Sequence, residues 1–372
     1  MALSLLWIQQ HEPDAYKRIA HVLLPKDFIG QRLTGEFATE PSDASATLLF
    51  DLRARNWSIR MLEACGVEPG WLPHVVESHA IIGRITSSAA HATGLVAGTP
   101  VIAGGGDTQC AALALGVTQP NVMACTIGTA AQLFLPTQSP VIDLQGRIHA
   151  LCHCLPDTWH VMGAHLNGGL CLSWLAGVFD GIPLAQLLDE AAQTPVGAAG
   201  LLFLPYLQGE RTPYFDADAR GVFFGLSTTH TRAHMTRAVL EGVAFSLRDS
   251  LDLFMQTQLG DHQVGSTSPQ HVAIKLTGGA AQSPLWAQIL ADVLGFPIQA
   301  SESPHGSAMG AALLAGMGIR WWLDPAALAL KTRNHFYQPR ADAVAQYHEI
   351  SSIYKALYPA LKLQFKQLKR KQ

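Results

Sequence analysis

The sequence predicts an α/β protein of two or three domains, and three observations support this. Its 372 residues amount to two or three domains at roughly 150 residues each. Hydrophobic residues make up 48% of the chain, a share that is normal for a packed protein and too high for a disordered one. Short apolar runs typical of strands alternate with helical patterns through the second half, which favours a sheet covered by helices.

The first hundred residues are expected to form helices on short loops. An amphipathic segment begins at Leu24-Pro25-Lys26-Asp27 and continues with the apolar residues Ile29 and Leu33. Residues 41–45, with the sequence Pro-Ser-Asp-Ala-Ser, are typical of a turn that caps a helix.

A strand, a glycine turn and a helix then follow one another around Asp107. The apolar residues 99–103 predict a buried strand that leads into Gly104-Gly105-Gly106-Asp107, and residues 108–115 predict a helix. Glycines let a ligand approach the backbone, and a carboxylate at the start of a helix can take a proton from a substrate hydroxyl. Asp107 is therefore either a general base or a plain helix N-cap, which Asp also makes well.

Beyond Pro120 the predicted strands become short and closely spaced. Residues 122–126, 131–135, 148–152 and 159–163 predict an antiparallel meander. The order continues with a helix over 170–179, a strand at 201–204, a helix over 234–256, a strand at 272–276, a helix over 284–294, a strand at 297–300 and a helix over 307–315. Residues from about 319 onward are expected to be helical and peripheral, and the basic run that ends at Lys371 is expected to be a solvated helix end.

Three further glycine turns are candidates for contacts with a phosphate or a nucleotide. Thr126-Ile127-Gly128-Thr129 follows a strand, Thr277-Gly278-Gly279 lies between a strand and a helix, and Asn167-Gly168-Gly169 precedes a helix. Free backbone N–H groups in such turns bind anions, but ordinary hairpin and βα turns have the same composition. Neither a Walker A loop nor the dinucleotide-binding fingerprint occurs, so phosphate binding would need a different device.

Charge and cysteine content argue against several classes of protein. The chain has 25 Lys and Arg against 28 Asp and Glu, a formal net charge of −3, so no nucleic-acid partner is expected. No apolar stretch approaches the ~18 residues of a membrane span and no secretory signal is recognisable, so no membrane partner is expected. Cys152-His153-Cys154 has no second ligand pair at zinc spacing, and two reduced core thiols in a cytoplasmic protein are the better interpretation.

Taken in order, these segments resemble the FGGY carbohydrate kinases, and within that family the xylulokinase subgroup. The most specific stretch runs from Gly221-Val222-Phe223-Phe224-Gly225-Leu226 through His234-Met235 to Ala238-Val239-Leu240-Glu241, and it resembles a family signature in residue type and spacing. Residues 203–213 resemble the xylulokinase form of the preceding loop, and residues 23–27 and 33–36 also resemble that subgroup. The similarity covers about residues 5–358.

The resemblance implies an actin-like (ribonuclease H-like) fold of two domains that enclose an ATP site between them. The first domain, residues 1–119, would be a remnant of the sugar-binding domain. Residues 120–358 would form the nucleotide-binding domain, and residues 359–372 a basic tail.

The resemblance also implies the roles of individual residues. Asp107 matches the catalytic base, with Thr108 beside it in the sugar site, and Gly128 and Thr129 match the loop that contacts the ATP phosphates. Positions that line the nucleotide are matched by Gly169, Gly278, Gly279 and Ser283. The implied reaction is the ATP- and Mg²⁺-dependent phosphorylation of D-xylulose to D-xylulose 5-phosphate, with the protein ligand of the metal unidentified.

Two departures from the family pattern leave alternatives open. The subgroup usually has Asn after the catalytic Asp, whereas Asp107-Thr108-Gln109 also resembles the autoinducer-2 kinases, so another ketose, a polyol or autoinducer-2 is an alternative substrate. Family members begin with a D-x-G-T-[ST] strand and turn that is not found in the sequence, so the first domain is expected to lack its N-terminal part. We then expect impaired kinase activity or an inactive nucleotide-binding remnant. We also expect exposed apolar side chains at Leu5, Leu6, Trp7 and Ile8, which would favour aggregation or a homodimer.

Overall fold

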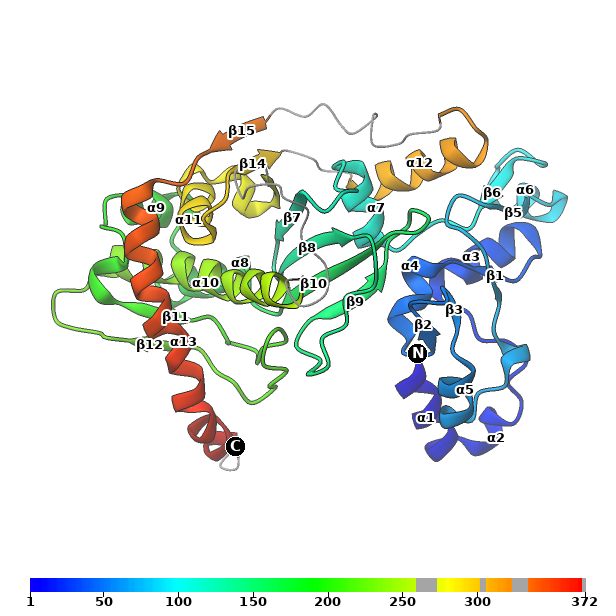
Figure 1. Cartoon of the computed structure of the whole chain (residues 1–372), viewed down its shortest axis with the longest axis horizontal. Helices are drawn as coiled ribbons and strands as arrows, with labels where there is room; N and C mark the ends of the chain where they lie inside the picture. The colour runs from blue at the N-terminus through cyan, green and yellow to red at the C-terminus, as the bar shows by residue number, and fades with distance from the viewer. Residues whose placement is uncertain (259–272, 302–305, 323–333, 370–372) are drawn as a thin grey trace.

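The computed structural model describes residues 1–258, 273–301, 306–322 and 334–369. Figure 1 shows a smaller N-terminal lobe, drawn in blue and cyan, beside a larger lobe built around one sheet. Strand β6 (Pro100–Ile102) ends the smaller lobe, and helix α7 (Asp107–Ala114) leads the chain into the larger one.

The N-terminal lobe is less purely helical than the sequence predicts. Its helices are α1 (Ala2–His11), α2 (Pro13–Tyr16), α3 (Pro25–Thr34), α4 (Pro41–Ala44), α5 (Ile59–Cys65) and α6 (Ser87–Thr93). Short strands form three two-stranded pairs: β1 (Ala38–Thr39) with β4 (His74–Val75), β2 (Phe50–Asp51) with β3 (Asn56–Trp57), and β5 (Ile81–Arg84) with β6. Two-residue strands carry too little periodicity to be recognised in a sequence.

The prediction of exposed apolar side chains on the first helix is only partly correct. Leu5 is 4% exposed and packs in a small core with Leu49 and Leu62, whereas Trp7 is 52% exposed. The prediction is wrong for Leu5 because α1 packs against α5 of the same lobe.

A seven-stranded mixed sheet forms the larger lobe. Its order is β15-β14-β13-β7-β8-β10-β9. The strands are β7 (Val122–Ile127), β8 (Ala131–Thr137), β9 (His149–Cys152), β10 (Trp159–His165), β13 (Ala273–Gly278), β14 (Ile298–Ser301) and β15 (Asn334–Tyr337). Strand β13 is parallel to β7 and β14, and the pairs from β7 to β9 are antiparallel. The predicted antiparallel strands are confirmed, but β8 pairs with β10 and leaves β9 at the edge, so they are not a simple meander.

Strand alternation divides the residues of β7 and β8 between two faces of the sheet. Met123, Cys125 and Ile127 belong to the large core, which also contains α8 (Gly169–Val178), α10 (Arg232–Gln258) and α11 (Pro284–Leu294). Ala124 and Phe134 instead pack with residues of α7. Because successive side chains of a strand point to opposite faces, Thr126 and Gln132 share the α7 face with them.

Two helices cross above that face of the sheet. Helix α12 (Gly306–Gly318) lies against α7, and Figure 1 shows the pair beside the upper ends of β7 and β8. A side chain at Gly310 would collide with the backbone of Cys110, so the close approach of the two helices depends on this glycine. The packing brings the start of α12 next to the α7 helix that begins with Asp107.

The remaining elements cover the other face. Helix α9 (Leu184–Ala192) and the strand pair β11 (Leu202–Leu204) with β12 (Val222–Phe224) pack beside α10. Helix α13 (Ala341–Lys369) contributes Tyr347, Tyr354 and Phe365 to the large core. The expectation that residues from about 319 onward are peripheral is therefore wrong for α13. The helix also continues without a break past residue 358, where the second domain was predicted to end.

The structure also bears on the cysteines and on membrane-spanning helices. All six cysteines are free and buried, which confirms the interpretation of Cys152 and Cys154 as reduced core thiols. Of the helices in the described ranges, none is both long and apolar enough to cross a membrane.

Candidate active site

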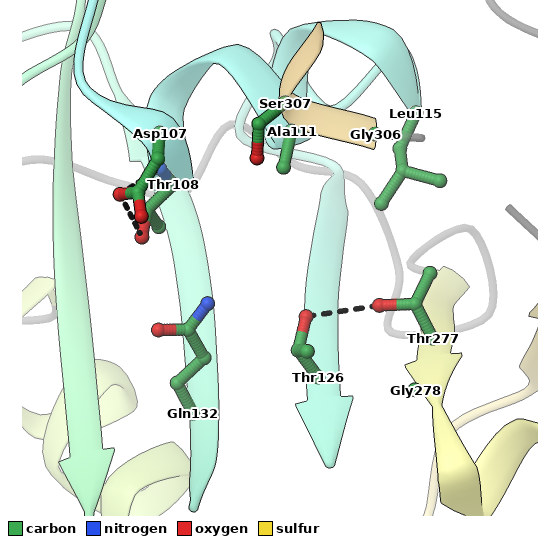
Figure 2. A pocket seen from close by; sticks show the side chains of 10 residues that line it. All are labelled: Asp107, Thr108, Ala111, Leu115, Thr126, Gln132, Thr277, Gly278, Gly306 and Ser307. Atoms are coloured by element: carbon green, nitrogen blue, oxygen red, sulfur yellow. Dashed lines mark hydrogen bonds between the residues drawn. The ribbon is translucent and has the colours of Figure 1, made fainter. Parts of the chain in front are cut away.

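A pocket of about 320 Å³ lies where α7, α12 and the sheet meet. Figure 2 shows its lining residues, which come from α7 and the residue after it, from the start of α12 and from three neighbouring strands. The lining residues are Asp107, Thr108, Ala111, Leu115, Thr126, Gln132, Thr277, Gly278, Gly306 and Ser307. Among these described residues, Asp107 is the one charged side chain.

The glycine turn after β6 presents Asp107 to this pocket. The N-cap of α7 is Gly106, and Asp107 is the first helical residue, so the prediction that Asp107 is a plain N-cap does not describe its position. Its side chain is exposed, and one carboxylate oxygen accepts hydrogen bonds from the backbone N–H (2.6 Å) and the hydroxyl (3.3 Å) of Thr108. A carboxylate at the first turn of a helix is held by the favourable helix dipole and remains available to a substrate proton.

The N-terminal lobe holds the turn in place through helix α4. The backbone N–H of Gly106 donates to the hydroxyl of Ser42 at 2.9 Å, and the amide of Gln109 donates to the carbonyl of Ser42 at 3.5 Å. Glu40 in turn caps α4 by accepting from the N–H of Ser42 (2.7 Å) and of Asp43 (3.0 Å). Residues 40–43 therefore fix the position of the loop that carries Asp107.

A half-buried lysine joins the same support. The Lys26 ammonium lies 2.6 Å from a carboxylate oxygen of Asp27 and 3.6 Å from one of Glu40, and it donates to the carbonyl of Ala103 at 3.2 Å. Ala103 directly follows β6, so Lys26 ties the acidic residues to the strand end from which the glycine turn leaves.

Asp43 lies near these carboxylates, and the pKa of its own carboxyl is perturbed. Burial raises the pKa of its carboxyl from 3.8 to about 6, against the pull of the nearby Lys26. The carboxylates of Glu40, Asp27 and Asp107 raise it further. Residues 26, 40 and 43 were not predicted as part of the site, because only the fold brings them to the Asp107 loop. The sequence offered one indication, which is that these charged residues lie in or near the turn-and-cap residues 41–45.

Two threonines form the floor of the pocket. Thr126 on β7 and Thr277 on β13 are register partners, and their hydroxyls are 2.9 Å apart in a hydrogen bond (Figure 2). Gln132 lies opposite Thr126 on the other side, on β8. Sequence reasoning did not single out Gln132 or Ser307 as site residues. Gln132 could have been found from strand alternation, because it is a polar residue on a strand that is otherwise apolar up to Pro136.

The predicted glycine turns converge at the ends of β7 and β13. The backbone N–H of Gly169 donates to the carbonyl of Gly128 at 2.7 Å, and the N–H of Gly168 donates to the carbonyl of Thr129 at 2.9 Å. Gly278 has a φ of 83° and a side chain there would collide with the carbonyl of Ile127, so only glycine fits this crossing. The turn residues Gly128, Thr129, Gly278 and Gly279 are exposed.

Of the turn residues, Gly278 lines the 320 Å³ pocket. Ser283 lies apart from them. It is 7% exposed, and its hydroxyl accepts from the N–H of Trp286 at 3.2 Å, which caps helix α11.

Comparisons with known proteins agree along most of the chain. Residues 1–114 match the N-terminal domain, and residues 123–319 the C-terminal domain, of the FGGY family of carbohydrate kinases. A xylulose kinase from Bacillus subtilis is 35% identical over 358 residues, which are 95% of this chain and 70% of that protein. An autoinducer-2 kinase from Yersinia enterocolitica is 30% identical, over 95% of this chain and 68% of that protein.

A solved structure agrees with the fold as well. The crystal structure of xylulose kinase from Rhodospirillum rubrum superposes with a TM-score of 0.87 at 31% identity, covering 98% of this chain and 72% of that one. The predicted α/β, actin-like two-domain fold is thereby confirmed.

Proposed function

Because this chain belongs to the FGGY family of carbohydrate kinases, we propose that it transfers the γ-phosphate of ATP to D-xylulose and forms D-xylulose 5-phosphate. The observation that supports this most strongly is the position of Asp107, an exposed carboxylate in a pocket that is also lined by the exposed turn residue Gly278. Phosphoryl transfer needs an oriented substrate hydroxyl, a base and groups that stabilise phosphate. Asp107 can supply the base, and the glycine turns can supply backbone contacts to phosphate.

In the proposed reaction Asp107 accepts the proton of the sugar hydroxyl. The hydroxyl oxygen forms a bond to the γ-phosphorus, the bond from that phosphorus to the bridging oxygen of ADP breaks, and ADP leaves with the electron pair. Thr108 holds one oxygen of the Asp107 carboxylate, which leaves the other oxygen to face the sugar.

The nucleotide is proposed to lie along the glycine turns. Thr129, Gly278 and Gly279 are exposed at the ends of β7 and β13, where backbone groups can contact phosphate oxygens. The N–H groups of Gly128 and Gly169 are paired with the carbonyls of Ala130 and Gly128, so these two glycines would shape the turns beside the nucleotide. For Ser283, the hydrogen bond to Trp286 supports an indirect role, in which it holds the start of α11 beside this region.

Mg²⁺ is proposed as the counter-ion of the phosphates. Besides the Asp107 carboxylate, the described lining offers neutral oxygens from Thr108, Thr126, Gln132 and Thr277. One carboxylate with neutral oxygens fits a metal that is held mainly by substrate phosphates and water. When bound, the metal would offset the phosphate charge during transfer.

Autoinducer-2 is the second candidate acceptor. It is favoured by Asp107-Thr108-Gln109 and by the autoinducer-2 kinase relative. The discriminating experiment measures ADP release by the 372-residue chain with each of four acceptors: D-xylulose, D-ribulose, a polyol and the linear form of autoinducer-2. We expect the largest kcat/KM with D-xylulose. A larger value with autoinducer-2 would replace the first candidate by the second. No sugar-dependent ADP release with any acceptor would contradict both and would favour the inactive nucleotide-binding remnant instead.

A further inference from the structure

Gln132 is a polar side chain in an unusual place for the strand that carries it. It lies on β8 between Ala131 and the apolar residues Leu133 and Phe134. Its backbone is fixed on both sides, because it is the register partner of Thr126 on β7 and of Ala164 on β10. The position of this side chain is therefore set by the middle of the sheet and not by a loop.

The amide of Gln132 has no protein partner within the described ranges, although it lines the pocket. The hydroxyls of the three threonines that line the pocket with it are already paired. Thr126 and Thr277 bind each other at 2.9 Å, and Thr108 donates to Asp107. Figure 2 shows the amide end of Gln132 pointing away from β8 towards Asp107 and Thr108. The unpaired amide of Gln132 therefore faces the Asp107 carboxylate across the space where the sugar would lie.

The chemistry of an amide suits a sugar better than a phosphate. The Gln side chain donates through its nitrogen and accepts through its oxygen, as a sugar hydroxyl also does. Phosphate oxygens only accept, and they are typically bound by cations or by backbone N–H groups. Of the glycine turns, the one that lines this pocket is at Gly278 on β13, and β7 with Thr126 separates it from Gln132 on β8.

We propose that Gln132 hydrogen-bonds the hydroxyl of the acceptor sugar next to the one that is phosphorylated, and so selects sugars by their configuration at that carbon. This inference rests on the proposed function, because it assigns the sugar to the Asp107 side of the pocket. For D-xylulose, phosphorylated at C5, the recognised group is the hydroxyl at C4. L-ribulose differs from D-xylulose only in its configuration at C4 and is the matched probe.

The test compares Gln132→Met, which keeps the length of the side chain and removes the amide, with the wild type. Gln256→Met is the control, since Gln256 is an exposed glutamine on α10 outside the pocket. Loss of one well-placed hydrogen bond should lower kcat/KM for D-xylulose by about 10- to 100-fold in Gln132→Met and leave the KM for ATP within about twofold. The preference for D-xylulose over L-ribulose should fall by a similar factor. The control should match the wild type, and thermal unfolding of both variants shows that they are folded.

A second readout separates this inference from the proposed function. Binding of D-xylulose is measured by titration calorimetry with the same three proteins, independently of turnover. If the wild type binds D-xylulose without phosphorylating it, and Gln132→Met binds at least about tenfold more weakly, the proposed function fails while the role of Gln132 stands. The inference is overturned if Gln132→Met keeps the wild-type affinity and sugar preference, if only the KM for ATP changes, or if the wild type does not bind the sugar. If Gln132→Met does not fold, Gln132→Glu, which keeps the shape and adds a charge near Asp107, must weaken sugar binding by the same factor or more.

Discussion

At the scale of single residues, the chemistry depends on one exposed carboxylate and on the groups that hold it. Asp107 was found from the sequence because a strand, three glycines, an acid and a helix follow one another without a gap. Its supporting residues were not found. Lys26, Glu40 and Ser42 lie more than 60 positions away from Gly106 in sequence, and nothing local in their patterns indicates which loop they contact.

The perturbed carboxyl of Asp43 predicts a pH-dependent stability. Its pKa is raised from 3.8 to about 6 in the folded protein, so the folded state holds the proton more tightly than the unfolded state does. This group therefore reduces stability as pH rises from about 4 to about 6, and the penalty persists above that window. Asp43→Asn should raise the melting temperature at about pH 8, and the difference from wild type should vanish near pH 4.

Thermal unfolding across this range of pH checks the prediction. Asp189→Asn, at an exposed position on α9, controls for the removal of one negative charge. A stabilisation by Asp43→Asn that is equal at both ends of the range would show that the carboxyl is not the cause.

At the scale of elements, the order of strands and helices in the larger lobe was predictable and their pairing was not. All ten helices and strands predicted between residues 122 and 301 have counterparts within a few positions, because each carries several apolar residues in one period. The exchange of β9 and β10 in the sheet was missed. Pairing depends on which strands meet across the fold, and a single sequence does not record it. The glycine turns were recognised, but their convergence follows from the parallel pairing of β7 and β13.

The crossing at Gly278 predicts a large effect of one methyl group. Gly278→Ala places a side chain at a φ of 83° and against the carbonyl of Ile127. We expect the free energy of unfolding to fall by about 1–3 kcal/mol and ADP to bind more weakly, as measured by denaturant titration and by calorimetry. Gly177→Ala is the control, since Gly177 lies on α8 with open space around it. Unchanged ADP binding in a folded Gly278→Ala protein would place the nucleotide elsewhere.

Experiments can separate two roles of Ser283, the predicted contact with the nucleotide and the cap of helix α11. As the cap of α11, its replacement by Ala should lower the free energy of unfolding by about 0.5–2 kcal/mol, and Ser283→Asn should restore most of that loss. The KM for ATP should stay close to that of the wild type in both variants. A raised KM without a loss of stability would instead assign Ser283 a direct contact with the nucleotide.

At the scale of the whole molecule, the last helix is part of the core and not an appendage. The basic residues near the end of the chain led to the prediction of a tail from residue 359, because charge dominates the local pattern there. The apolar residues of α13 are spaced widely enough that their common face is clear only when the helix is seen against α10 and α11. We retain residues 1–119 and 120–358 as proposed domains and extend the second through α13.

Phe365 tests that extension. It is 3% exposed in the large core, so Phe365→Ala should lower the free energy of unfolding of the larger lobe by about 3–5 kcal/mol. Leu363, two positions earlier and 68% exposed, is the matched control, and Leu363→Ala should change stability by less than about 0.5 kcal/mol. Equal small effects of the two changes in denaturant unfolding would show that residues 359–369 do not contribute to the core.

The central claim is that Asp107 takes the proton from the sugar hydroxyl, and it is tested most directly by the kinetics of Asp107→Asn with D-xylulose and ATP. Coupled measurement of ADP release should show that kcat falls by about 10²–10⁴-fold, the range for loss of a general base, while the KM for ATP stays near that of the wild type. Asp189→Asn should retain the wild-type rate. Sugar-dependent turnover by Asp107→Asn at the wild-type rate would contradict the account.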